Sequence, residues 1–247
     1  MAFVALTTAC EPELVVGTWT CPPPDTQADG SADKVVEVPW TTGFETGFCE
    51  YGRSLGYCYN DPDASHRVVD APVHSGNHAA AFSVTSEPSG LQARCFLEGA
   101  LPRDATYGAW FYLPTRATNA GNWNLMHFQG GSLGALHGLW DVSLASAADG
   151  SSFLYVFGFL GAGLRAPDTP RPVPIKSWFH VEFRFQRAAD ATGEIALYQD
   201  GAPLMQLTGL TTDDTDFGQW YVGNYADALT PANSTVYVDD VTIRAAP

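Results

Sequence analysis

The last third of the chain alternates apolar and polar residues with a period of two. In SWFHVEFRFQ the apolar positions are Phe179, Val181, Phe183 and Phe185. The same alternation returns in GEIALYQDGAPL, FGQWYVGNYAD and STVYVDDVTI, with Gly or Asp-Gly in the gaps. An amphipathic helix would place its apolar residues three and four positions apart, and these segments lack that spacing. The pattern therefore predicts antiparallel β-strands joined by short turns.

Further strands are predicted upstream of this region. We expect VVEVPW (35–40) to be the first strand and LQARCFLEGAL (91–101) to pair with TYGAWFYLP (106–114). LWDVSLAS and SSFLYVFGFL are expected to form a hairpin around Asp149, and no helix longer than a turn or two is expected. A length of 247 residues with 24 Gly and 17 Pro suits one turn-rich domain. The sequence thus indicates an all-β fold, a two-sheet antiparallel sandwich over residues 35–247.

The N-terminal segment does not follow the strand pattern. Residues 1–9 are a mostly apolar run that leads into LTTAC, which is similar to the end of a bacterial lipoprotein signal with Cys10 as the lipidated residue. No basic stretch precedes the run, and Leu6 lies one position further from the cysteine than in such signals. We expect residues 1–21 to be a leader and tether and the Pro-rich residues 22–34 to be a flexible linker. The alternative is a disordered leader with an unmodified cysteine.

The chain has five cysteines. If Cys10 carries lipid, four remain, which is the even number expected for two disulfides in an exported protein. Cys49 and Cys58 enclose a short polar loop, so we expect them to pair and to leave Cys21 with Cys95. A cysteine metal site is not expected, because no CxxC spacing occurs.

The charge of the chain restricts its partners. Asp and Glu number 27 against 12 Lys and Arg, for a net charge of -15. Nucleic-acid binding requires a basic surface, so we expect no nucleic-acid partner. The same charge argues against adhesion to an anionic membrane surface, and membrane contact is expected only through a lipid anchor at Cys10. The sequence also lacks GxSxG, P-loop, HExxH and ExDxxE motifs.

The strand alternation assigns side chains to faces, because residues two apart point to the same side. With the apolar residues in the core, the opposite faces carry Gln92, Arg94, Glu98, Trp123, His127, Gln129, His180, Glu182, Arg184, Tyr221 and Tyr225. Aromatic rings pack on sugar rings, and amides and guanidinium groups bind hydroxyls and carboxylates. We therefore expect a glycan-binding face composed of Trp123, His127, Gln129, Arg184, Tyr221 and Tyr225. The alternative is an ordinary solvated sheet face.

Several short motifs resemble those of concanavalin A-like jelly-roll domains. GFETGFC is similar to the opening of MAM domains, and the GNY and DDV runs resemble laminin-G-like binding modules. PVHSG and the tryptophan–histidine strand resemble heparinase I-like lyases. The resemblance implies a jelly-roll order of strands and either a glycan or a protein ligand.

Alginate lyases and related jelly-roll polysaccharide lyases carry three strand motifs, of the types RxEL, QIH and YFKxGxYxQ. WYVGNYAD resembles the third motif, with Tyr225 at its second tyrosine and Tyr221 at the lysine position. Leu125-Met126-His127 resembles the second motif but has Leu125 in place of Gln, and Gln129 lies two residues beyond the histidine. Arg94 matches the first motif without its Glu.

In such lyases an Arg and a Gln neutralise the uronate carboxylate, a His or Tyr removes the C5 proton, and a Tyr protonates the leaving oxygen. The resemblance implies Arg94 and Gln129 as neutralising groups, His127 as base and Tyr225 as acid. The departures at the neutralising positions favour a binding role. The leading hypothesis is an exported carbohydrate-binding module that recognises a polysaccharide, the second is a polysaccharide lyase, and the third is a protein-binding adhesion module.

Jelly-roll glycan modules often hold Ca²⁺ between an early FE and a late DD motif, which here correspond to Glu45 and Asp239. Period-two alternation places Asp239 on the same face as Val241 and Ile243, in apolar surroundings. A buried carboxylate needs a counter-charge, and a hard cation would supply it. We expect a structural calcium ion there. The alternative is that Asp239 accepts backbone N–H groups or pairs with an arginine.

Overall fold

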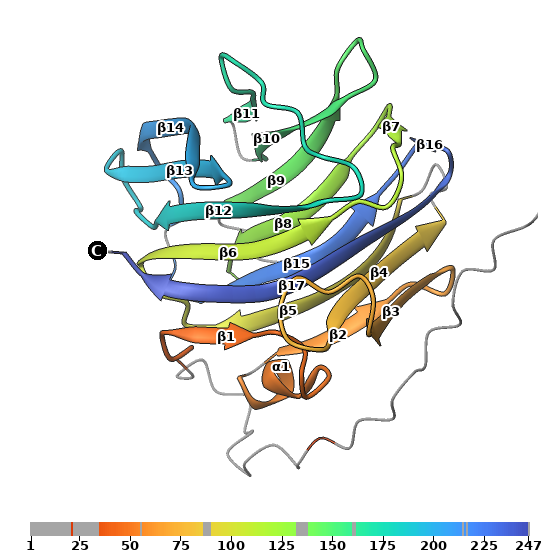
Figure 1. Cartoon of the computed structure of the whole chain (residues 1–247). Coiled ribbons are helices and arrows are strands. Elements are labelled where there is room, and N and C mark those ends of the chain that lie inside the picture. Colours follow the sequence, from red (N-terminus) through yellow and green to blue (C-terminus); the bar gives the residue numbers. More distant parts are fainter. Residues whose placement is uncertain are drawn as a thin grey trace, which may run out of the picture.

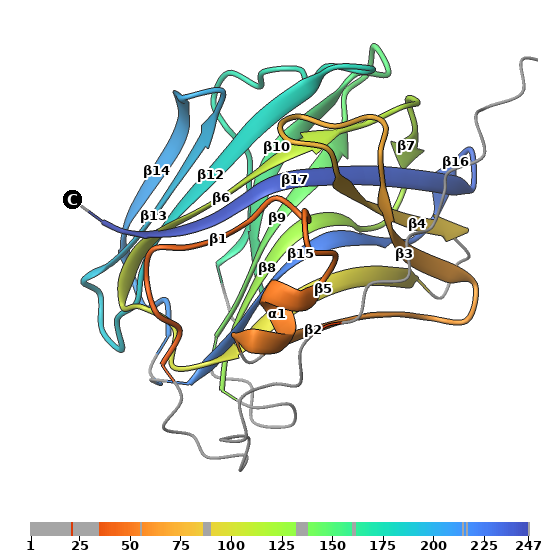
Figure 2. The ribbon, with the colours of Figure 1, turned by 60° about the horizontal axis from the view of Figure 1, so that its bottom comes forward.

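Two antiparallel β-sheets pack face to face. The computed structural model describes residue 21, residues 35–54, 56–85, 90–131, 138–159 and 162–213, residue 215, and residues 217–246. Figure 1 shows the eight-stranded sheet in front of the seven-stranded sheet, and Figure 2 shows both layers after a rotation. The predicted all-β sandwich is confirmed.

The eight-stranded sheet has the order β14-β13-β12-β6-β17-β4-β3, and β1 pairs with β17 beside this path. Its strands are β1 (Trp40–Thr42), β3 (Ala64–Val69), β4 (Ala79–Thr85), β6 (Asp104–Tyr112), β12 (Trp178–Gln186), β13 (Gly193–Gln199), β14 (Ala202–Leu210) and β17 (Asn233–Ala245).

The seven-stranded sheet has the order β11-β10-β9-β8-β15-β5-β2. Its strands are β2 (Gly56–Asn60), β5 (Leu91–Gly99), β8 (Trp123–Gly130), β9 (Gly138–Ser146), β10 (Ser152–Gly158), β11 (Gly163–Arg165) and β15 (Gly218–Ala226). A small ladder joins β7 (Thr118–Asn119) to β16 (Leu229–Thr230), and helix α1 spans Cys49–Arg53.

The core lies between the two sheets, where the apolar residues of the alternating strands meet. Phe183 and Phe185 of β12 are buried and their rings contact that of Phe128 on β8. Trp220 of β15 lies 5.1 Å from Tyr107 of β6, measured between ring centroids. The side chains predicted to point inward on β12 thus fill the core, which leaves the outer face of each sheet to carry polar groups.

Two of the strand predictions are wrong. Strands β5 and β6 do not pair: β5 lies between β15 and β2 in one sheet, and β6 lies between β12 and β17 in the other. The chain crosses between the sheets after β5, and alternation within a strand does not specify its partner. The first strand starts at Trp40, while Val35 forms an isolated bridge to Ala100.

The predicted disulfide pairing is also wrong. The bonds are Cys21–Cys49 and Cys58–Cys95. Cys58 and Cys95 are directly opposite each other on β2 and β5, whereas Cys49 lies in α1. Pairing across strands therefore replaced the short-loop pairing expected from sequence spacing. Two disulfides are typical of exported proteins, as predicted.

Cys10 and residues 22–34 lie outside the described residues, so the lipidation and the linker stay predictions. Within the described residues, no helix has the length and apolar character needed to span a membrane.

Candidate functional site

Strand β8 contains a bulge that brings two polar residues to one face. Met126 pairs with Val142 and Asn124 with Ser143, so Leu125 is an extra residue opposite β9. In a regular strand, residues three apart point to opposite faces. Because Leu125 is not paired, Asn124 and His127 are two paired positions apart, and both side chains lie on the outer face of the seven-stranded sheet.

His127 is held by a carboxylate on the neighbouring strand. Its Nδ1 lies 2.6 Å from Oδ1 of Asp141, and both side chains are largely buried. A carboxylate accepts hydrogen bonds, so the imidazole donates from Nδ1 and its Nε2 carries the free lone pair. Nε2 makes no hydrogen bond to the described residues. The arrangement leaves it available to accept a proton.

Tyr221 and Arg94 complete a stack with the His127 ring. The rings of His127 and Tyr221 are 4.7 Å apart and 14° from parallel. The Arg94 guanidinium carbon lies 4.5 Å from the Tyr221 ring centroid and 5.0 Å from that of Tyr59. Burial raises the pKa of Tyr221 well above its ordinary value, so this phenol stays protonated. Tyr221 thus positions its two neighbours without titrating.

Gly223 leaves space in the middle of this group. It lies between Tyr221 and Tyr225 on β15 and pairs with Arg94 on β5. A Cβ at this position would lie 2.4 Å from the Ala93 carbonyl oxygen and 2.8 Å from Cβ of Arg94. A side chain would therefore clash with β5 and displace Arg94. This close approach accounts for the glycine in the GNY motif.

Asn124 is a buried amide without a partner. It is 1% exposed, and neither its oxygen nor its nitrogen has a hydrogen-bond partner within the described residues. Its cross-strand neighbours are Tyr225 on β15 and Ser143 on β9. An unsatisfied buried amide costs roughly 1–3 kcal/mol, so such a group needs an explanation. A polar ligand that accepts and donates hydrogen bonds at this position would provide one.

The other residues predicted for the glycan-binding face are only partly brought together. Gln129 lies opposite Gln219 on the same outer face, two residues from His127. Trp123 is wrong as a surface residue: it is 1% exposed, and its Nε1 donates to Oδ1 of Asn224 in the core. The bulge at Leu125 is the reason, because it turns Trp123 inward when it turns Asn124 outward.

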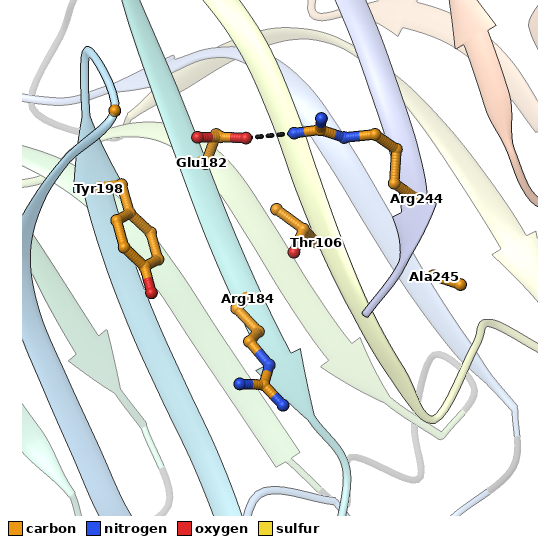
Figure 3. Close-up of a pocket in the computed structure, with 7 residues that line it drawn as sticks. Thr106, Glu182, Arg184, Tyr198, Arg244 and Ala245 are labelled. Carbon is orange, nitrogen blue, oxygen red and sulfur yellow. Dashed lines mark hydrogen bonds and ion pairs between the residues drawn. The ribbon is translucent and has the colours of Figure 1, made fainter. Parts of the chain in front are cut away.

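Arg184 lies on the opposite sheet, away from the His127 group. It donates two hydrogen bonds to Asp104, at 3.2 and 3.1 Å. Together with Glu182, Tyr198 and Arg244 it lines an open hollow of about 370 Å³ on the outer face of the eight-stranded sheet (Figure 3). Figure 3 also shows the ion pair between Glu182 and Arg244. Because both guanidinium groups already have carboxylate partners, this hollow has no free positive group to offer a uronate.

Glu45 and Asp239 both bind the loop 74–78 between β3 and β4. Oε1 of Glu45 accepts the N–H groups of residues 77 and 78, at 2.8 and 3.0 Å. Asp239 is buried and accepts the N–H groups of residues 74, 75 and 240. Among the described residues, no three His, Cys, Asp or Glu side chains are arranged to share a metal ion. Amide donors already satisfy Asp239, as in the alternative given above, and calcium stays a prediction.

A second bulge explains why the surroundings of Asp239 differ from those predicted. Asp239 pairs with Trp110 and Thr242 with Gly108, so β17 has one extra residue at this point. Asp239 therefore lies on the outer side of the sheet under the loop 74–78, while Val241 points into the core.

Asp141, Asn124 and Ser143 were not predicted as site residues. Asp141 and Ser143 share one face of LWDVSLAS, so the alternation of that strand contained a signal for them. Asn124 had none, because its orientation depends on the bulge.

Comparison with known proteins identifies the fold of the chain through structure and not through sequence. No protein-family model matches it, and no curated protein sequence does. The endo-β-1,4-glucuronan lyase of the fungus Trichoderma reesei has a similar structure, with a TM-score of 0.58 and 17% identity over 77% of this chain and 90% of that one. Cellulose induced protein, Cip1, has a TM-score of 0.58 and 12% identity, over 83% and 97% of the two chains.

An alginate lyase, Aly36B, solved as a mutant in complex with an alginate trisaccharide, has a TM-score of 0.58 and 9% identity, over 85% of this chain and 95% of that one. At such identities the likeness shows the fold. The chain has the concanavalin A-like jelly-roll fold that structures of alginate lyases and a glucuronan lyase share.

Proposed function

We propose that the chain is a polysaccharide lyase that cleaves a uronate-containing glycan by β-elimination on the outer face of its seven-stranded sheet. The observation that carries this proposal is the group around Gly223, in which Arg94, Asn124, His127 and Tyr225 share one face. The likeness to lyase structures supports it.

His127 is the base of the proposed reaction. Its Nε2 takes the C5 proton of the uronate, and the hydrogen bond from Nδ1 to Asp141 fixes the tautomer that leaves Nε2 unprotonated. Asp141 also stabilises the imidazolium that forms after proton transfer. Asp141 is therefore a positioning residue, which acts through His127.

Arg94 and Asn124 receive the uronate carboxylate. A C5 proton is weakly acidic until the adjacent carboxylate charge is offset, so a lyase needs donors at this position. Arg94 supplies a cation beside Gly223, and Asn124 supplies an amide N–H whose hydrogen-bonding capacity is unused within the described residues. Gln129, the neutralising group implied by the sequence, lies on the same face beyond His127 and contributes a further amide.

Tyr225 is the proposed acid. As the C5 proton moves to Nε2 of His127, the C5–H electron pair forms the C4–C5 double bond. The bond from C4 to the leaving oxygen breaks, and that oxygen takes a proton from the Tyr225 hydroxyl. The products are a new reducing end and an unsaturated uronate. No metal ion or organic cofactor is required in these steps.

The position of Asn124 favours the lyase hypothesis over the binding-module hypothesis. The departures from the lyase motifs at the neutralising positions favour a binding role: Leu125 occupies the Gln position of the second motif, and Arg94 lacks the Glu of the first. The bulge at Leu125 puts the Asn124 amide on the reactive face, next to His127. The face thus has three candidate neutralising groups, Arg94, Asn124 and Gln129, which supports the lyase hypothesis over the binding module.

The test is incubation of the purified protein with alginate, glucuronan, heparin, chondroitin and ulvan, following the ultraviolet absorbance of the unsaturated uronate. Variants His127→Ala and Tyr225→Phe should lose about 10²–10⁴-fold in rate. His180→Ala is the matched control, because His180 is a half-buried histidine on the outer face of the opposite sheet. A flat trace with every polysaccharide, together with retention of one in a pull-down, would replace the lyase by a binding module.

A further inference from the structure

One line of residues crosses all seven strands of the sheet through His127. Directly opposite residues in adjacent strands share a face, so the register can be followed from strand to strand. The line is Tyr57 on β2, Phe96 on β5, Tyr221 on β15, His127 on β8, Asp141 on β9, Phe157 on β10 and Leu164 on β11.

Both ends of this line are exposed apolar side chains. Tyr57 and Leu164 are each 57% exposed, on the two edge strands of the sheet. The large apolar residues described as exposed are these two, Phe159 and Val35. Two of four such residues therefore lie on the line that contains the proposed base, one at each end.

Tyr57 is held so that its ring is available to a ligand. Its centroid lies 4.0 Å from that of Phe96, with the rings 65° apart. Phe96 is buried and packs edge to face, which supports Tyr57 from below. The exposed ring face is the surface on which a pyranose ring packs.

The spacing suits an extended glycan. Adjacent strands lie about 4.7–4.9 Å apart, so each end of the line is three steps, or about 14 Å, from His127. A pyranose unit is about as long as one such step. A glycan that crosses the strands would place about three units on each side of the cleaved bond.

We infer that the substrate chain runs across the strands along this line, and that Tyr57 and Leu164 are its outermost sugar-binding platforms. The inference rests on the proposed function, since it identifies the ends of the same site. Single exposed apolar side chains separated by polar and buried groups suit a sugar chain, whereas a protein partner needs a contiguous apolar patch. Because the line reaches both edge strands of the sheet, the inference predicts cleavage inside long chains.

The experiment measures binding separately from cleavage. Oligosaccharides of increasing length, prepared from the polysaccharide of the panel that binds or reacts best, are titrated calorimetrically into His127→Ala protein. Affinity should rise with length until the glycan reaches Tyr57. Adding Tyr57→Ala should remove the gain in affinity that the longest oligosaccharides show, about three- to tenfold. The affinity for short oligosaccharides should stay unchanged. Tyr57→Phe keeps the ring and should keep the increase.

Leu164→Ala should have a similar effect at the other end, and Val35→Ala is the control for loss of an exposed apolar side chain outside the line. If Tyr57→Ala and Leu164→Ala bind every length as the parent does, while the wild type cleaves, the inference is wrong and the lyase stands. If the wild type binds but does not cleave, the lyase proposal fails, and loss of the length-dependent gain in affinity in Tyr57→Ala still supports the line as a glycan-binding site. Absence of both binding and cleavage would overturn both proposals.

Discussion

Asn124 and His127 lie on the same face of β8 although they are three residues apart in sequence. The extra residue Leu125 makes this possible, and it places an unpaired amide beside a histidine whose tautomer is fixed. The chain thus has the spacing N-x-x-H on this face, where the motif it resembles has Q-x-H.

Loss of the Asp141 carboxylate should reduce turnover. We expect Asp141→Ala to lower kcat about 10- to 100-fold with little change in KM, because Nδ1 of His127 loses its acceptor and the ring is free to change tautomer. Asp141→Asn keeps an acceptor oxygen and should recover part of the rate. Steady-state kinetics on the reactive polysaccharide measures both. An effect confined to KM would mean that Asp141 contacts the glycan directly.

Replacement of Asn124 should separate stability from activity. Asn124→Leu removes an amide that has no partner within the described residues and fills a similar volume. The free energy of unfolding should stay the same or rise by about 1 kcal/mol, since the cost of burying the amide disappears. Cleavage should fall strongly. Urea unfolding and the absorbance assay check the two effects, and a destabilised variant would show that Asn124 has a structural role.

A buried ion pair at one end of the sandwich should be important for stability. Nε of Arg187 donates to Oδ2 of Asp213 at 2.7 Å, and its Nη1 donates to the Leu101 carbonyl oxygen. Both side chains are almost fully buried. Asp213→Ala leaves the guanidinium without its carboxylate and should lower the free energy of unfolding by about 3–5 kcal/mol. Arg171→Ala, which removes an exposed pair with Asp200, is the control and should cost less than about 1 kcal/mol.

The stability of the metal-free protein should depend on Asp239. Burial raises the pKa of this carboxyl to about 6, from an ordinary value of 3.8. The folded state binds the proton more tightly than the unfolded state, so this group's contribution to stability is lost as pH rises through about 6. In EDTA, the melting temperature of the wild type relative to Asp239→Asn should therefore increase from pH 7 to pH 5.

Calcium tests the metal prediction in the same experiment. An ion at Glu45 and Asp239 would favour the ionised carboxylate, so Ca²⁺ should raise the melting temperature at pH 7 and reduce the pH dependence. Equal melting temperatures in Ca²⁺ and EDTA would contradict the prediction that calcium binds at this site.

The sequence predicted local features well and long-range ones poorly. Alternation identified the strands and assigned the correct faces to Arg94 and Tyr221, because side-chain direction follows a period of two in a regular strand. It assigned Trp123 and Asp239 to the wrong faces, since each lies beside a bulge whose extra residue reverses the inward and outward alternation. The alternating pattern contains no sign of such an extra residue.

Contacts between distant segments were also missed. The partner of β5 and the partner of Cys58 depend on how the strands are ordered in the sheet. Arg184 shows the same limit: it points outward, as expected, but its strand belongs to the other sheet. The order of the strands in the two sheets decides which outward-facing side chains share a surface. The sequence of a single strand does not contain that information.

The Cys58–Cys95 bond affects how the protein has to be produced. It attaches the edge strand β2 to β5, and an edge strand that comes loose exposes unpaired backbone groups to other chains. Synthesis in a reducing cytosol would leave that strand without its covalent link. We therefore expect soluble yield to depend on secretion or on an oxidising host, and material refolded with reductant present to aggregate edge to edge.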